Sequence, residues 1–171
     1  RQYPQTTSPV PPHAGEAVQL DADLMFLEGL SATSHKVYLG TTAGNLVYQT
    51  ELTTSNIFDP GTLQPGQTYF WRVDAVTANG EIQGDVWSFT TQYFYNVTVN
   101  SGSGNGLYTV GSTIAITADA APAGKGFDTW TGDTQYLADV LSPTGSLTIG
   151  NEDINLTATY RDVTTPGEVI T

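Results

Sequence analysis

Residues 63–91, LQPGQTYFWRVDAVTANGEIQGDVWSFTT, decide the fold of this chain. Five apolar residues in this stretch share one phase of an alternating pattern, namely Leu63, Tyr69, Trp71, Val73 and Ala75. A β-strand points every second side chain to the same side, so the pattern predicts a strand with one buried face. A turn at Asn79-Gly80 follows, and a second strand begins near Val86. We therefore expect the closing hairpin of a β-sandwich.

Further strand-like segments precede this hairpin, separated by turns rich in Gly, Pro and Asn. The predicted strands of the first module are Ala17–Leu27, His35–Leu39, Leu46–Thr50, Gln67–Thr77 and Asp85–Thr91. Short strands at such spacing predict an Ig-like sandwich over residues 9–92. The polar, Pro-containing start of the chain indicates a lead-in or linker at residues 1–8.

A second alternating pattern begins near residue 93 and continues to residue 161. Tyr95, Val97 and Val99 alternate, and Phe127 and Trp130 are large apolar anchors. Residues 134–143 form an irregular segment with room for a helical turn, and residues 162–171 indicate a tail. No segment has a sustained 3.6-residue apolar period, so we expect an all-β chain made of a sandwich and a small, mostly-β repeat module.

The composition excludes several classes of function. The 171 residues carry 17 acidic and 5 basic side chains, a net charge of −12 that is spread over both modules. This acidity disfavours nucleic acid as a partner, because phosphate binding needs clustered Lys and Arg. The apolar runs are too short to span a bilayer, so we expect no membrane insertion.

Residue usage indicates where the protein works. Because the chain has no cysteine, it forms neither a disulfide framework nor a thiolate metal site. Abundant Thr, Ser, Gly and Asn with little Lys are typical of a secreted bacterial protein. No signal peptide is visible, and the chain is interpreted as a mature or excised part of a longer protein.

Three motifs in the first module point to a known family. They are Val37–Thr41 (VYLGT), Leu63–Val73 (LQPGQTYFWRV) and Gly84–Thr91 (GDVWSFTT). With these motifs the module resembles fibronectin type III domains of secreted bacterial proteins. The resemblance implies that Tyr69 forms a tyrosine corner, with its hydroxyl near the backbone of Leu63. Phe26 stands where the family usually has a tryptophan.

Four motifs in the second module point to another family. They are Val97–Val99 (VTV), Gly111–Ala118 (GSTIAITA), Gly124–Gly132 (GKGFDTWTG) and Asp153–Tyr160 (DINLTATY). Residues 94–161 thus resemble the divergent internalin-type B-repeat of bacterial surface proteins. The resemblance implies a small β-rich extracellular unit used for display, spacing or adhesion. Neither family brings catalytic residues with it.

The residues themselves give little support for catalysis. The two histidines, His13 and His35, lie in no motif that supplies a nucleophile. Carboxylates cluster as Asp21 with Asp23, Asp74 with Glu81 and Asp85, and Glu152 with Asp153. We expect these acids to be exposed and solubilising, because nothing in the sequence indicates the cleft that a glycosidase needs. We therefore expect no enzyme.

Calcium is the one cofactor that the sequence leaves open, because this ion takes oxygen ligands from loops. Asp128 and Asp133 flank Trp130, and Asp139 follows in the irregular segment. The chain has no loop of the D-x-D-x-D-G kind, so exposed acids without a metal are the alternative.

Aromatic residues provide the only indication of a ligand site. Trp71, Trp87 and Trp130 are in phase with core residues, so we expect them to be structural. The candidates for stacking on a sugar ring are Phe70, Tyr48, Tyr108 and Tyr136. The alternative is that they are ordinary surface aromatics, or that Phe70 packs within the module.

We expect a non-catalytic extracellular spacer and adhesion segment whose partners are flanking domains, a polysaccharide or another surface protein. One alternative is a carbohydrate-binding accessory region of a polysaccharide-degrading enzyme. Another is a filament subunit, in which Arg1–Val10 or Thr164–Thr171 adds a strand to the next copy. The junction Thr91–Phe94 contains no Gly or Pro, so we expect it to be semi-rigid.

Overall fold

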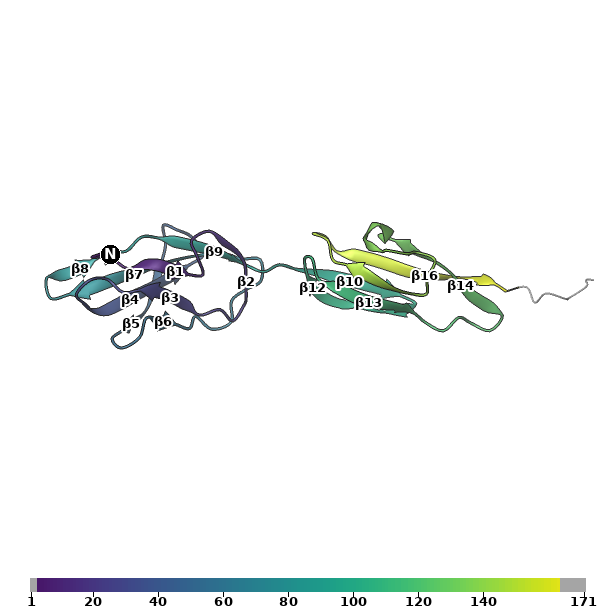
Figure 1. Cartoon of the computed structure of the whole chain (residues 1–171), viewed down its shortest axis with the longest axis horizontal. Coiled ribbons are helices and arrows are strands. Elements are labelled where there is room, and N and C mark those ends of the chain that lie inside the picture. Colours follow the sequence, from purple (N-terminus) through teal and green to yellow (C-terminus); the bar gives the residue numbers. More distant parts are fainter. Residues whose placement is uncertain (1–2, 164–171) are drawn as a thin grey trace, which may run out of the picture. The chain divides into compact units, whose positions relative to one another are not determined.

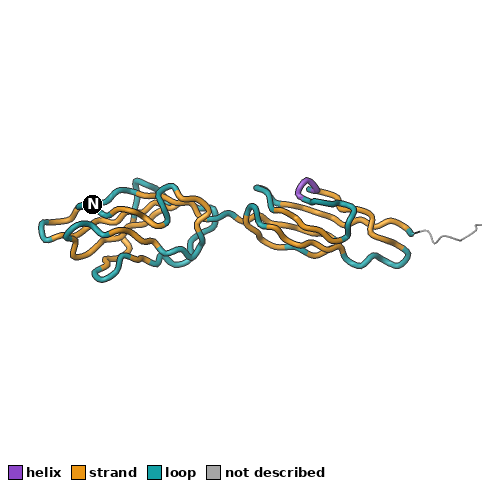
Figure 2. The backbone as a smooth tube through the Cα atoms, in the orientation of Figure 1, coloured by secondary structure: helices purple, strands orange, loops and turns teal. Residues whose placement is uncertain are grey.

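Strands and the turns between them make up nearly all of the described residues, as Figures 1 and 2 show. The structure is a computed structural model, which describes residues 3–163. The chain divides into two units, Arg1–Tyr93 and Phe94–Thr171. Within the described residues the only helical element is a 3-10 turn at Thr134–Tyr136 (η1). The all-β class predicted from the sequence is confirmed.

The first unit consists of two sheets. Its three-stranded antiparallel sheet has the order β1 (Thr7–Val10), β3 (Leu24–Leu27) and β6 (Ile57–Phe58). The order in its second sheet is β2 (Gly15–Val18), β9 (Trp87–Thr91), β7 (Thr68–Thr77), β4 (Ala32–Gly40) and β5 (Val47–Leu52), with β8 (Gly80–Ile82) also beside β7. All neighbours in this sheet are antiparallel except β2 and β9, which are parallel.

The core of the first unit contains the predicted apolar face of residues 63–91. Trp71 and Trp87 pack edge to face, with ring centroids 4.9 Å apart, and both are buried. Phe26, which stands where fibronectin type III domains usually have a tryptophan, is also buried. The structural role expected for the two tryptophans is confirmed.

The lead-in predicted at residues 1–8 is wrong for residues 6–8. Thr7 and Ser8 belong to β1, and Thr6 is completely buried. The reason lies in the pairing of β7, whose residues 68–71 pair with β9 and whose residues 75–77 pair with β8. Val73 lies between these two segments and has no strand partner from either of them. The Thr6 hydroxyl fills this gap by donating a hydrogen bond of 2.6 Å to the Val73 carbonyl oxygen.

Two other sequence predictions for the first unit also change. The predicted strand Ala17–Leu27 is two strands, β2 and β3, which belong to different sheets. Residues 7–10 of the proposed filament donor already pair with β3 of their own chain. The other proposed donor, Thr164–Thr171, lies outside the described residues.

The second unit also has two sheets. The larger has the order β12 (Gly106–Thr109), β10 (Phe94–Asn100), β16 (Ile154–Asp162) and β14 (Lys125–Gly132), with β10 and β16 parallel. The smaller has the order β11 (Gly102–Ser103), β13 (Thr113–Ala118) and β15 (Thr144–Thr148). Trp130 is buried in the core, as expected, and its indole N–H donates to the Ser142 carbonyl oxygen at 2.9 Å.

The irregular segment of the second unit contains the expected helical turn, which is η1. The predicted tail begins too early, because Asp162 still pairs with Lys125 at the end of β16. The rest of that predicted tail, from residue 164 onward, lies outside the described residues.

Candidate functional site

The outer face of the larger sheet in the first unit carries a group of aromatic and charged side chains. Residues directly opposite each other in an antiparallel pair lie on one face. Tyr38 on β4 lies opposite Tyr48 on β5 and opposite Arg72 on β7. Phe70 is two residues from Arg72 along β7 and therefore shares this face. We call Tyr38, Tyr48, Phe70 and Arg72 the aromatic face.

The aromatic face offers one well-exposed ring. Tyr48 is 51% exposed and meets Tyr38 edge to face, with centroids 5.7 Å apart. The guanidinium carbon of Arg72 lies 4.5 Å from the centroid of the Tyr38 ring, which is a cation–π contact. Phe70 is half-buried. The aromatic face thus combines an apolar ring surface with polar groups held in fixed positions beside it.

A buried carboxylate holds Arg72 in place. Asp74 accepts hydrogen bonds from Nε and Nη2 of Arg72, at 2.8 and 2.9 Å, and from the backbone N–H of Gly84 at 2.9 Å. Only 2% of Asp74 is exposed, so the prediction that it is a solubilising surface acid is wrong. Burial is tolerated because three donors satisfy the carboxylate. The bidentate pair keeps the guanidinium against Tyr38 and neutralises its charge.

Two of the four predicted aromatic candidates, Phe70 and Tyr48, are thus brought to one face. Sequence reasoning missed Tyr38 and Arg72. The sequence Arg72-Val73-Asp74 on a predicted strand indicates the ion pair, because residues i and i+2 of a strand point to the same side. The position of Tyr38 depends on strand register, which the sequence does not give.

Tyr108 and Tyr136 lie in the second unit, and each packs over a glycine. The Tyr108 hydroxyl donates to the Asn105 carbonyl oxygen at 3.3 Å, and its ring lies beside Gly106. The Tyr136 hydroxyl donates to Oε1 of Glu152 at 2.6 Å, and this hydrogen bond raises the pKa of Tyr136. A Cβ at Gly150 would lie 2.4 Å from the Tyr136 ring. Both rings therefore have a packing role.

The three calcium candidates have separate partners. Asp128 lies 3.6 Å from Nε of Arg161. Asp133 accepts from the backbone N–H of Asn155 at 2.8 Å, and Asp139 accepts from that of Leu141 at 2.9 Å. Among residues 3–163 no group of three or more His, Asp or Glu side chains is placed to hold a metal ion. The structure therefore does not gather these aspartates into a metal site.

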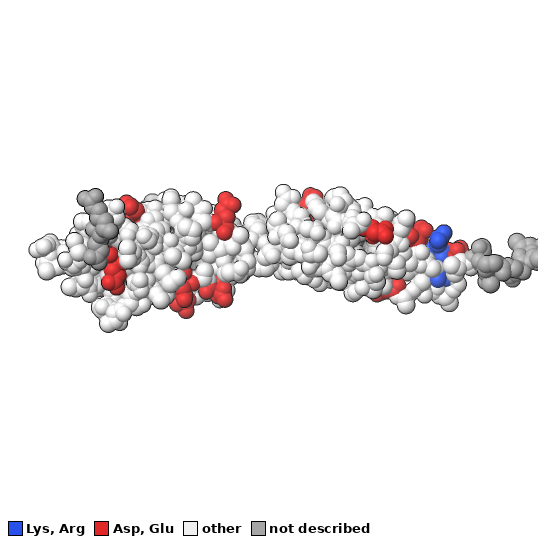
Figure 3. Space-filling model, in the orientation of Figure 1, with Lys and Arg blue, Asp and Glu red and all other residues white. Residues whose placement is uncertain are grey.

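Both histidines contact other parts of the first unit. Nδ1 of His13 accepts a hydrogen bond of 3.1 Å from the backbone N–H of Ser88. His35 is buried, with its ring centroid 5.0 Å from that of Phe26, and burial lowers its pKa. Figure 3 shows acidic side chains dispersed over both units on the face drawn.

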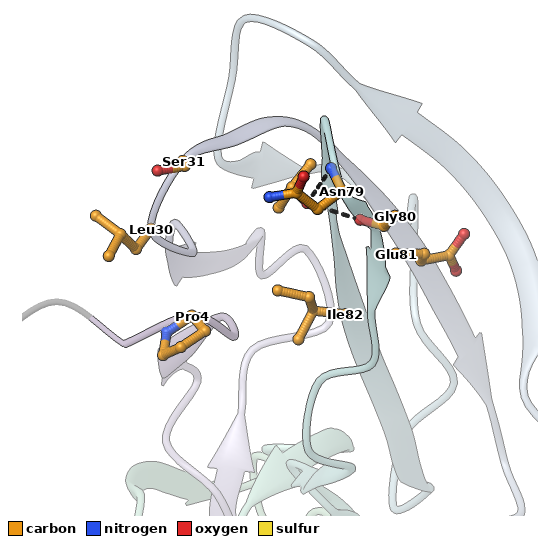
Figure 4. A pocket seen from close by; sticks show the side chains of 8 residues that line it. Pro4, Leu30, Ser31, Asn79, Gly80, Glu81 and Ile82 are labelled. Carbon is orange, nitrogen blue, oxygen red and sulfur yellow. Dashed lines mark hydrogen bonds between the residues drawn. The ribbon is translucent and has the colours of Figure 1, made fainter.

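A small open hollow lies where the β7–β8 turn meets the start of the chain (Figure 4). Its volume is about 260 Å³, and its apolar side chains include Pro4, Leu30 and Ile82. Asn79 and Glu81 contribute polar groups to the lining. None of the site residues predicted from the sequence lines this hollow.

Comparison with known protein families finds a match within the second unit. Residues 95–164 match the family model of the divergent InlB B-repeat domain. This family is associated with bacterial surface proteins, so the second unit is similar to a bacterial surface repeat module. The resemblance predicted for residues 94–161 is thereby confirmed. No curated protein matches the chain. In the part of the chain that the structure describes, no helix has the length and apolar character needed to cross a membrane.

Proposed function

We propose that this chain is a non-catalytic module pair from a larger secreted or cell-surface bacterial protein, in which it acts as a spacer and adhesion segment. The observation that carries the proposal is the match of residues 95–164 to a repeat family associated with surface proteins. Its partners are then the flanking domains of that protein and the surface that they reach.

We further infer that the first unit is an Ig-like sandwich of the fibronectin type III kind. Two features support this assignment. One sheet has the order β1-β3-β6 and faces a sheet that contains β9-β7-β4-β5. The backbone N–H of Gln64 donates to the Tyr69 hydroxyl oxygen at 3.0 Å, as in a tyrosine corner. Such sandwiches are scaffolds, and function resides in sites placed upon them.

The surface location is tested with antibodies raised against the chain. Intact and permeabilised cells of the organism that encodes it would be labelled and compared. We expect equal labelling of both, or recovery of the protein from the culture medium. Labelling that appears only after permeabilisation would overturn the proposal.

A carbohydrate-binding role is the second candidate, and the aromatic face is the observation that favours it. Tyr48 gives an exposed ring, and the Arg72–Asp74 pair gives fixed polar groups beside it. We propose a neutral polysaccharide as ligand, because the cation on this face is already paired with a carboxylate. A polysaccharide-degrading enzyme would then be the parent protein.

This second role is tested by affinity electrophoresis through gels that contain soluble polysaccharides, with and without calcium. We expect retardation by one glycan that is lost in Tyr48→Ala. Tyr3→Ala is the matched control, because Tyr3 is 52% exposed and its backbone pairs with Leu30, outside the strands that carry the aromatic face. Equal loss in both variants, or no retardation by any glycan, would contradict the role. Dependence on calcium would reopen the metal site predicted at Asp128, Asp133 and Asp139.

A further inference from the structure

In each unit the strand near its start is a parallel neighbour of its last strand. In the first unit β2 pairs in parallel with β9, with Gly15 opposite Phe89 and Val18 opposite Thr91. In the second unit β10 pairs in parallel with β16, from Val97 opposite Ile154 to Asn100 opposite Thr157. Parallel neighbours place the start of one strand and the end of the other at opposite ends of the paired segment, as Figure 1 shows for β10 and β16.

This geometry determines how tension along the chain acts on each unit. In the second unit, force pulls the start of β10 and the end of β16 in opposite directions, parallel to both strands. In the first unit β1 precedes β2 and pairs antiparallel with β3, so the same load reaches the β2–β9 pair once the contacts of β1 and Thr6 have given way. The pair is therefore sheared, and all its hydrogen bonds carry the load together. An antiparallel terminal pair would have both ends on one side, and its hydrogen bonds would break one after another. Forced unfolding is governed by the unfolding rate. We expect this rate to be lower when the hydrogen bonds of the pair must break together than when they break one by one.

Additional hydrogen bonds lengthen the loaded contact in the first unit. The backbone N–H of Ala14 donates to the Ser88 carbonyl oxygen at 2.7 Å, and that of Gln92 donates to the Val18 carbonyl oxygen at 2.9 Å. Upstream, the hydrogen bond from Thr6 to Val73 ties the segment before β1 to β7. Tension on the first unit must therefore break the Thr6–Val73 hydrogen bond, which lies before β2 in the chain, and also the hydrogen bonds between β2 and β9.

In the second unit the two loaded strands are both internal to their sheet. β10 lies between β12 and β16, and β16 lies between β10 and β14, so neither slides without disturbing a second neighbour. Just before β16, Oδ1 of Asp153 accepts a hydrogen bond of 2.8 Å from the backbone N–H of Asn96. This charge-assisted bond extends the β10–β16 ladder toward the start of β10.

We propose that both units are mechanical clamps, which resist tension transmitted between the two ends of the chain. The inference deepens the proposed spacer function and rests on it for the source of the tension. The resistance itself is a property of the topology, which holds wherever the protein is located.

Single-molecule force spectroscopy on the whole chain tests the clamps. With handles at the two ends we expect two unfolding events. They would release about 290 Å of chain for residues 7–91 and about 230 Å for residues 94–162, at ~3.4 Å per extended residue and before the folded length is subtracted.

A second pulling direction provides the comparison. The chain has no cysteine of its own, so T113C with T148C supplies two unique attachment points. These positions are directly opposite at one end of the antiparallel pair β13–β15, so this load unzips the second unit. We expect it to unfold at clearly lower force than with end-to-end pulling. Equal or higher force in the unzipping direction would overturn the clamp.

A matched pair of variants tests the contribution of Asp153. Asp153→Ala should lower the end-to-end unfolding force of the second unit, whereas Asp139→Ala should not. Both changes remove one exposed carboxylate that accepts from a backbone N–H, but only that of Asp153 joins the loaded strands. Equal lowering by both variants would overturn this role. Failure of surface labelling would remove the source of tension but leave these forces unchanged, so the two proposals fail separately.

Discussion

Asp74 carries a charge on a strand position that alternation assigns to the outer face, yet it is buried. Asp74→Ala would leave the Arg72 guanidinium and the Gly84 N–H without their acceptor. Removing one partner of a buried ion pair costs about 3–5 kcal/mol, and we expect about 3 because Arg72 keeps some access to water. The loss would be measured as the free energy of unfolding of the first unit, by urea titration with tryptophan fluorescence.

Asp85→Ala is the control for this substitution. Asp85 accepts a hydrogen bond from the Gln5 side chain but is exposed, so its removal should cost less than about 1 kcal/mol. A loss of similar size in both variants would contradict the importance given to the buried pair.

His35 should make the stability of the first unit depend on pH. Burial lowers its pKa below the ordinary value of 6.5, so the unfolded chain binds a proton more readily than the folded one. Stability is then complete above about pH 6.5 and falls as pH decreases toward the folded-state pKa. We expect a lower urea midpoint at about pH 5.5 than at about pH 7.5.

His35→Phe isolates this contribution, because a phenyl ring retains the contact with Phe26 but does not titrate. The difference between the two urea midpoints should shrink in the variant. An unchanged difference would assign the pH dependence to other groups.

At the scale of single elements, the sequence predicts strands well where one face is fully apolar. Residues 67–77 form β7 almost as expected, because Trp71, Val73 and Ala75 are all buried. The sequence does not predict the burial of Thr6, because this residue is polar and alternation gives no signal for a side chain that donates to an unpaired backbone carbonyl. The interruption between β8 and β9 is likewise hidden, since it depends on how Gly84 meets Asp74.

The candidate site was predictable only in part for a related reason. The outward phase of Phe70 follows from alternation along its own strand. The exposure of Tyr48 does not, because Val47, Tyr48 and Gln49 are all exposed in β5. The association of Phe70 and Tyr48 with Tyr38 depends on the register of β4 against β5, which includes an irregularity between Val37 and Tyr38. Tertiary register is set by packing and turns, so no single-strand pattern contains it.

The segment just before β1 should contribute to the stability of the first unit through Thr6. Thr6→Val keeps the shape of the side chain but leaves the buried Val73 carbonyl oxygen without its donor, which costs about 1–3 kcal/mol. Urea titration would detect the loss in the unfolding of the first unit. The matched control is Thr33→Val. Thr33 donates to the Val76 carbonyl oxygen but is exposed, so water can take over this hydrogen bond in the variant. If both variants lose the same stability, Thr6 does not have the role assigned here.

At the scale of the whole molecule, the connection between the units is very short. The ring of Tyr93 lies against Gly66 within the first unit, where an added Cβ would be 2.2 Å from it. Phe94 already begins β10 of the second unit, opposite Thr109. Residues 91–94 contain no Gly, so this segment differs from the Gly/Ser-rich composition of a flexible linker.

We therefore expect the units to tumble together in solution. Backbone ¹⁵N relaxation should give similar rotational correlation times for both units, longer than the value for either unit alone. Inserting a Gly-Ser-Gly-Ser segment between Tyr93 and Phe94 is the control, since a flexible linker lets each unit reorient separately. Separate tumbling in the unaltered chain would contradict the semi-rigid junction. It would leave the clamps intact, because each arises within one unit.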